Sequence, residues 1–261
     1  MIYKLLHKNL YKFIKKFYQT VDNQNFCGII YIKNDENVYE EDYMKKNMYS
    51  LMLSEKVVEE IDRLAEKEGT NRSNLVNQIL ADYVSVTTPE KRISDIFEKI
   101  ESLFGGDASF PVYRESHDNT LSIKSALSYK YRPTLRYEVE LYRTEGGAFG
   151  ELKVNFRTQS PELLTKLTEF FRYWERLEEI YVSSFFSGGK IRYTLDEYKW
   201  TRSLSFPENK RYENEDLSVA ISNYVKVFDR LLKKYLANGY SDLRELENDY
   251  LAALNGGMNI I

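Results

Sequence analysis

Residues 48–84 read MYSLMLSEKVVEEIDRLAEKEGTNRSNLVNQILADYV, and this stretch decides the fold of the N-terminal part of the chain. Its first seven side chains alternate, with Leu51 and Leu53 on one side, which predicts a half-buried strand. Ser54 is a suitable N-cap for a helix that Gly69 ends as the C′ residue. Asn71 can cap a second helix, in which apolar residues recur at helical spacing. The predicted order is one strand followed by two short amphipathic helices.

Such a unit is too small to complete its own structure. A single strand leaves both of its backbone edges unpaired, and two short helices have no core in which to bury their apolar stripes. A second copy supplies both a partner strand and a partner apolar face. We therefore expect an obligate homodimer whose subunits share one antiparallel ribbon.

The strand and first helix, SLMLSEKVVEEIDRLAEKEG, and the entry to the second helix, TNRSNLVNQIL, carry a family likeness. In these residues the sequence resembles the ribbon-helix-helix superfamily, the Arc, MetJ and CopG group of bacterial and phage DNA-binding proteins. The resemblance covers residues 44–84, and MKKN at Met44 is similar to the starts common in that family. It implies that the paired strands enter the DNA major groove and that the start of the second helix binds phosphates.

The resemblance also implies positions for the contacts with nucleic acid. The groove-facing strand positions are Met48, Ser50 and Met52, the phosphate contacts are Asn71, Arg72 and Ser73, and Lys45 and Lys46 add backbone contacts. Family members usually carry hydrogen-bonding side chains on this strand, whereas a methionine offers no strong hydrogen bond. We therefore expect sequence readout by this ribbon to be weak or largely apolar.

Composition limits the remaining classes of function. Hydrophobic residues make up 43% of the 261 residues and charged residues 30%, which is typical of a soluble globular protein. No apolar run reaches the roughly 18 residues of a membrane span, so we expect none. Cys27 is the only cysteine and there are two histidines, so we predict no disulfide, no metal site and no cofactor in a cytoplasmic protein. We expect no enzymatic activity.

Residues 1–43 differ in composition from the rest of the chain. Apolar residues at helical spacing alternate there with lysines, which predicts a basic amphipathic helix. It could be an arm for nucleic acid or a membrane surface, a helix packed on the remaining chain, or sequence upstream of a true start at Met44 or Met48.

The sequence predicts α+β structure after residue 86. A helical linker over residues 87–106 starts at Pro89, and it either lengthens the dimer seam or packs on the next domain. Residues 107–212 form a domain in which Ile123–Arg132, Leu135–Tyr142 and Leu152–Phe156 alternate as antiparallel strands and a long helix starts at Pro161. Residues 190–206 form one bent strand or a tight hairpin. Residues 213–261 form a C-terminal helical hairpin, whose second helix opens at Ser241.

Cations recur at the outward positions of the predicted sheet, with tyrosines between them. A possible second nucleic-acid surface consists of Lys124, Lys130, Arg132, Arg136 and Arg157, with Lys190, Arg192, Lys199 and Arg202 as an extension. Aromatic and basic side chains together can bind single strands. Glu138, Glu140 and Glu151 share this face, so an ordinary solvated sheet surface is the alternative.

These patterns predict a dimeric ribbon-helix-helix protein that binds nucleic acid. The resemblance favours a DNA-binding transcriptional regulator, with a C-terminal domain that senses a ligand or binds a partner. The alternative is an accessory protein of a relaxosome, partition or defence/CRISPR system. It would use the ribbon mainly to dimerise and the basic sheet face to bind RNA, single strands or a protein partner. An antitoxin is disfavoured, because its extension would be short and disordered until bound.

Overall fold

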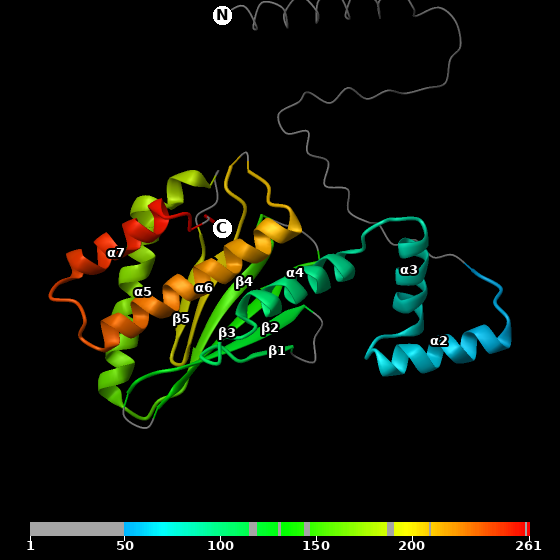
Figure 1. Ribbon diagram of the computed structural model, residues 1–261, viewed down its shortest axis with the longest axis horizontal. Helices are drawn as coiled ribbons and strands as arrows, with labels where there is room; N and C mark the ends of the chain where they lie inside the picture. Colours follow the sequence, from blue (N-terminus) through cyan, green and yellow to red (C-terminus); the bar gives the residue numbers. More distant parts are fainter. Residues whose placement is uncertain are drawn as a thin grey trace, which may run out of the picture. The chain divides into compact units, whose positions relative to one another are not determined.

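The computed structural model describes residues 50–114, 119–129, 132–143, 147–186, 191–208, 210–258 and 260–261 (Figure 1). The predicted basic extension over residues 1–43 and the candidate contacts Lys45, Lys46, Met48, Lys130 and Lys190 lie outside these ranges. The described residues form six α-helices and a six-stranded antiparallel sheet. The α+β class predicted from the sequence is confirmed.

Residues 50–86, here called the N-terminal segment, contain α2 (Glu55–Lys67) and α3 (Arg72–Tyr83). The carbonyl oxygen of Ser54 accepts the first hydrogen bonds of α2, although its side chain makes no capping bond. Gly69 follows α2 with a φ of 67°, a left-handed conformation that glycine adopts without a steric penalty. The Asn71 side chain accepts from the amide of Asn74 and caps α3. The sequence thus predicted where α2 and α3 start and where α2 ends.

Residues 87–261, here called the body, contain the sheet. Its strands are β1 (Val112–Arg114), β2 (Thr120–Ala126), β3 (Thr134–Leu141), β4 (Gly150–Phe156), β5 (Tyr193–Asp196) and β6 (Lys199–Leu204). Their order is β1-β2-β3-β4-β6-β5, and every neighbouring pair is antiparallel. The second half of residues 190–206 pairs with β4 and the first half forms the edge, so the hairpin is the correct interpretation of that stretch.

The strand predicted over Ile123–Arg132 is wrong beyond Ala126. The backbone turns there, because the amide of Leu127 donates to the carbonyl of Pro133 and the amide of Arg132 donates to the carbonyl of Tyr129. Arg132 has a φ of 44°, which is unusual for a side chain of this size. The alternation of apolar and polar residues continues in the sequence past Ala126, where the hydrogen-bonded pairing with β3 stops.

The body contains four α-helices. They are α4 (Pro89–Phe104), α5 (Pro161–Tyr181), α6 (Asn214–Leu236) and α7 (Leu243–Asn255). The hydroxyls of Thr88 and Ser160 cap α4 and α5, each of which carries proline in its first turn, as the sequence predicts. Asp242 caps α7, one residue later than the predicted Ser241.

The linker helix α4 belongs to the core of the body. Its stripe of Ile93, Ile96, Phe97, Ile100 and Phe104 is buried, and α4 packs along α6. The Ser218 hydroxyl on α6 donates to the carbonyl of Ile96. The stripe is therefore unavailable for a dimer seam, and packing on the following domain is the correct interpretation.

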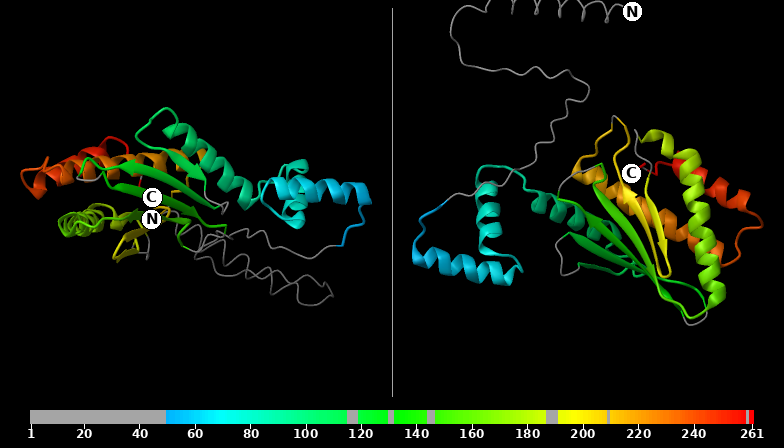
Figure 2. Two further views of the ribbon diagram at one scale, coloured as in Figure 1. Left: turned by 90° about the horizontal axis from the view of Figure 1, so that it is seen from below. Right: turned by 180° about the vertical axis from the view of Figure 1, so that it is seen from behind.

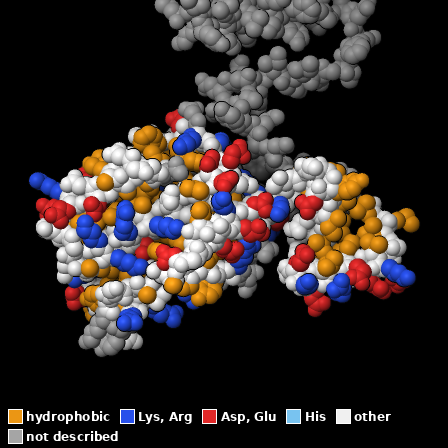
Figure 3. Space-filling model, in the orientation of Figure 1, with side chains coloured by type: hydrophobic (Ala, Val, Ile, Leu, Met, Phe, Trp, Pro, Cys, Tyr) orange, Lys and Arg blue, Asp and Glu red, His pale blue; other side chains and the backbone are white. Residues whose placement is uncertain are grey.

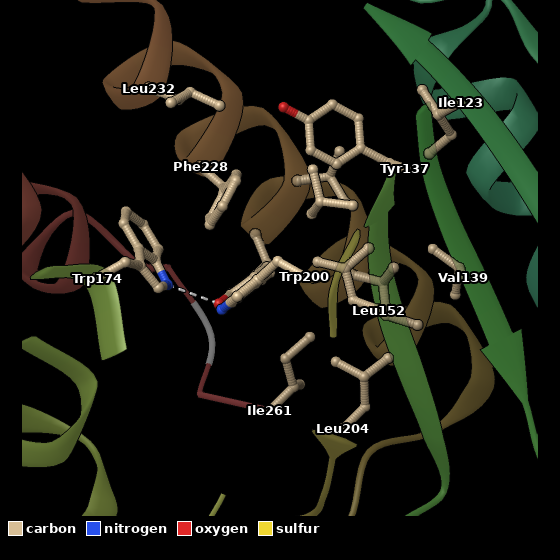
Figure 4. Close-up of a cluster of buried hydrophobic side chains, with 14 of the residues drawn as sticks. Ile123, Tyr137, Val139, Leu152, Trp174, Trp200, Leu204, Phe228, Leu232 and Ile261 are labelled. Atoms are coloured by element: carbon tan, nitrogen blue, oxygen red, sulfur yellow. Dashed lines mark hydrogen bonds between the residues drawn. The ribbon is translucent and has the colours of Figure 1, made fainter. Parts of the chain in front are cut away.

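Aromatic side chains join the sheet to α5 and α6. Phe228 of α6 lies between the rings of Trp174 and Trp200, with centroid distances of 4.8 and 5.2 Å (Figure 4). The Tyr137 hydroxyl of β3 reaches α6 and donates to Asp229 at 2.9 Å. In the view from behind, the strands lie in front of α6, so α6 covers the face of the sheet that points away from the viewer (Figure 2). All four aromatic residues are fully buried, which fixes the sheet against both helices.

The sequence predicted that Arg202 extends the outward row of cations, and this prediction is wrong. It shares the inner face of β6 with Trp200 and Leu204, and only 1% of its side chain is exposed. Its Nε donates to Glu178 of α5 at 2.9 Å, and its guanidinium lies 4.7 Å from the centre of the Tyr224 ring. The hydroxyls of Tyr193 and Tyr224 donate to the same carboxylate. A buried charge is tolerated here because its partner and further hydrogen bonds are present.

None of the helices in the described ranges is both long and apolar enough to span a bilayer.

Candidate nucleic-acid interface

Exposed apolar side chains concentrate in the N-terminal segment. Of the 14 large hydrophobic side chains that are exposed among the described residues, nine lie between residues 51 and 86. They are Leu51, Met52, Leu53, Val57, Ile79, Leu80, Tyr83, Val84 and Val86. The only buried hydrophobic residues of this segment are Ala65, Leu75 and Ala81. Hydrophobic side chains accordingly gather over α2 and α3 in the space-filling view (Figure 3).

The strand predicted before α2 is not formed within residues 50–54, and these residues are exposed on both sides. Met52 is completely exposed and Ser50 is also exposed, while Leu51 and Leu53 on the opposite side are 60% and 45% exposed. No strand among the described residues pairs with them. Their backbone groups and both sets of side chains are therefore available to a partner.

The three predicted phosphate contacts at the start of α3 differ in the interactions that their side chains make. Asn71 uses its side-chain oxygen to cap the helix, and Ser73 is exposed. Arg72 forms a two-pronged ion pair with Asp62 of α2, in which Nε lies 2.6 Å and Nη2 2.5 Å from the carboxylate oxygens. The structure brings these residues together on one surface, with the guanidinium already occupied.

The ion pair has a direct electrostatic effect on both partners. The hydrogen bond from Arg72 holds the pKa of the Asp62 carboxyl below its usual range, and the same bond raises the pKa of Arg72. Both groups are exposed to water, which weakens the pair. Arg72 therefore links α2 to α3 in the free chain, and a phosphate must compete with Asp62 for it.

The second predicted surface separates into two parts. In the first part, Lys124 lies directly opposite Arg136 on neighbouring strands. Arg136 forms an ion pair with Glu138, and the Lys124 ammonium lies 4.5 Å from the centre of the Tyr113 ring. These two cations have partners within the sheet, which favours the interpretation as an ordinary solvated face.

Arg132 and Arg157 form the other part, in the β2–β3 turn and directly after β4. Both line a hollow between the β2–β3 turn and the start of α5. The sequence predicted both residues as part of the second surface but gave no reason to place them together. They are 25 positions apart, and they line the same hollow only because the pairing of β2, β3 and β4 brings their segments together.

Two features of the described residues were not foreseen from the sequence. One is the Asp62 carboxylate, since its spacing from Arg72 fits no regular helical pair. The other is the buried carboxylate of Glu178, which follows Leu177 on the apolar side of α5. No group of three metal-binding side chains occurs within the described ranges.

The chain matches no protein-family model, no curated protein and no solved structure. The residues of the N-terminal segment and the body are therefore the only basis for a function.

Proposed function

We propose that the protein is a dimeric ribbon-helix-helix DNA-binding protein that acts as a transcriptional regulator, with the body as its effector or partner-binding domain. One observation carries the proposal. The N-terminal segment exposes nine large hydrophobic side chains within 36 residues, and its residues 50–53 pair with no described strand, whereas the described part of the body exposes five such side chains.

A second copy of this chain is the partner that fits the segment best. An antiparallel strand satisfies the backbone groups of residues 50–53, and the partner helices cover Ile79, Leu80 and Val84. The sequence order of strand, helix, helix favours the same arrangement. The ribbon would then present Ser50 and Met52 outward, to the edges of bases in the major groove.

Matched substitutions test the dimer. Ile79 on α3 is 47% exposed and Ile180 on α5 is 53% exposed, so both tolerate a charge in the free chain. We expect Ile79→Asp to make the full chain monomeric and to abolish duplex binding, whereas Ile180→Asp changes neither. Sedimentation of the full chain at micromolar concentration measures the first, and titration of duplex DNA measures the second. A monomeric wild-type chain, whether its apolar face is covered by residues 1–49 or not covered, would overturn the proposal.

The role of Arg72 needs a pair of variants, because its ion pair also supports the segment. Arg72→Gln removes both functions, while Asp62→Asn releases the guanidinium. A phosphate contact predicts weaker duplex binding in Arg72→Gln, with a salt slope reduced by about 1. It predicts equal or tighter binding in Asp62→Asn. Equal weakening in both variants would show that the residue only supports the segment.

The accessory-protein alternative is favoured by one feature, the fully exposed Met52 on the groove-facing side. Its thioether offers little to a base edge. Titration with single-stranded RNA and with duplex DNA at two salt concentrations separates the two functions. RNA binding that depends on Lys124 and Arg136 would favour the accessory protein.

A further inference from the structure

The body contains a hollow that the proposed DNA contact does not use. It has a volume of about 1180 Å³ and lies where the β2–β3 turn faces the segment from β4 into α5. Its described lining is Ala126, Leu127, Ser128, Tyr129, Arg132, Pro133, Arg157, Thr158, Gln159, Ser160 and Glu162. Ligand sites in proteins commonly have volumes of several hundred Å³, so this hollow is large enough for a small molecule.

The charges of the lining favour an anion. Arg132 and Arg157 have no ion pair with any residue in the described part of the chain. Glu162 is the one acid of the described lining, and its carboxylate lies 3.2 Å from the ammonium of Lys166. The hollow therefore presents two cations without a counter-charge among the described residues, although the whole chain has a net charge of −3.

The backbone of Arg132 supports a role for its side chain. A φ of 44° places it in the left-handed region, where a long side chain is disfavoured relative to glycine or asparagine. The residue is held there by the hydrogen bond from its amide to the carbonyl of Tyr129. Strained positions of this kind concentrate at binding sites.

The kinds of side chain narrow the class of anion. Two guanidinium groups offer paired donors that match the oxygens of a phosphate. Tyr129 is half-buried and can supply an aromatic surface, and Thr158 and Gln159 add polar groups. Arg136 of the first sheet surface is paired with Glu138, so its charge adds little to that of the hollow. We propose that the hollow binds a phosphorylated small molecule of nucleotide size.

This inference is independent of the DNA contact, because every residue involved belongs to the body. It gives the effector domain of the proposed regulator a specific class of ligand. A protein that fails to bind DNA could still bind the ligand, and the converse also holds.

Calorimetric titration of the full chain tests the site, with adenosine monophosphate and inorganic pyrophosphate as probes and sodium chloride of equal ionic strength as the blank. Arg132→Asn removes the guanidinium while asparagine tolerates the left-handed backbone, and Arg157→Gln removes the second. Arg172→Gln is the matched control, since Arg172 is an exposed arginine on α5 outside the lining. We expect each of the first two variants to weaken binding at least tenfold and the control to leave it unchanged. Circular dichroism verifies that all three variants fold.

Three results would overturn the proposal. One is the absence of saturable binding by both probes at about 1 mM. Another is an equal loss of binding in Arg172→Gln, which would show a general charge effect. The third is an oligodeoxynucleotide that binds more tightly than either probe and depends on the same two arginines, which would assign the hollow to a nucleic-acid strand.

Discussion

The N-terminal segment and the body of this chain differ in how completely they bury their apolar side chains. Trp174, Trp200 and Phe228 have no exposed surface, and the charged groups buried among them have partners. The buried hydrophobic residues of the N-terminal segment are two alanines and one leucine. The body therefore has an extensive hydrophobic core, while the segment buries too few apolar side chains to form a core of its own.

The two regions also hold their helices together by different means. In the body, α5 and α6 are joined by the edge-to-face contact of Trp174 with Phe228 and by the hydrogen bond from the Trp174 indole to the Tyr224 hydroxyl, at 2.8 Å. In the segment, an exposed ion pair between Arg72 and Asp62 links α2 to α3. Exposed ion pairs contribute little to stability, whereas buried aromatic packing contributes much. A bound partner would therefore increase the stability of the segment far more than that of the body.

The largest effect is expected from Arg202→Met in the body. Removal of the guanidinium leaves the carboxylate of Glu178 buried without its counter-charge, which costs about 3–5 kcal/mol. Urea denaturation followed by tryptophan fluorescence measures the free energy of unfolding, because Trp174 and Trp200 both lie in the body.

The double variant Arg202→Met, Glu178→Leu is the control for this prediction. It removes both charges, so we expect it to recover much of the lost stability. A loss below about 1 kcal/mol in the single variant would mean that water reaches Glu178 and that the body is less closed than its burial indicates.

Alkaline pH should destabilise the body. Burial, the charge of Asp229 and the hydrogen bond to it all raise the pKa of Tyr137 well above its usual value, and burial does the same for the pKa of Tyr224. Unfolded tyrosine ionises near pH 10, so their contribution is complete below about pH 10 and is lost as the pH rises further. Each group lowers stability by about 1.4 kcal/mol per pH unit in that range.

Urea unfolding between pH 8 and about pH 11 measures this slope. Tyr137→Phe should make the slope shallower by the share of one group, because phenylalanine does not ionise. Equal slopes for the wild-type chain and Tyr137→Phe would contradict the closed body.

The smallest effect is expected from Asn71→Ala in the N-terminal segment. Loss of the capping bond to the amide of Asn74 costs about 1 kcal/mol in helix stability. Hydrogen exchange of the α3 amides should accelerate, while exchange in α5 and α6 stays unchanged. Ser73→Ala, at an exposed position without the capping bond, is the control. An equal change in α6 would show that the two regions unfold together.

The sequence predicted most helix boundaries, because caps, prolines and Gly69 act within a few residues of chain. It also predicted β3, β4 and α5, whose apolar periods are long and regular. It failed where a period continued past the structure, as after Ala126, and where a charge stood at an inward position, as with Arg202. A residue type indicates only how often such a side chain is buried. An arginine is usually exposed, and the burial of Arg202 is explained only by its ion pair with Glu178.

The sequence by itself determined most helix boundaries, the strands β3 and β4, and the amphipathic character of residues 48–84, since these depend on local backbone and side-chain preferences. Only the tertiary structure decided that α4 packs into the body, that Arg72 contacts Asp62, and that Arg132 and Arg157 line one hollow. Such contacts join residues distant in the chain through strand register and helix packing, which depend on how all the buried side chains fit together. No local pattern contains that information.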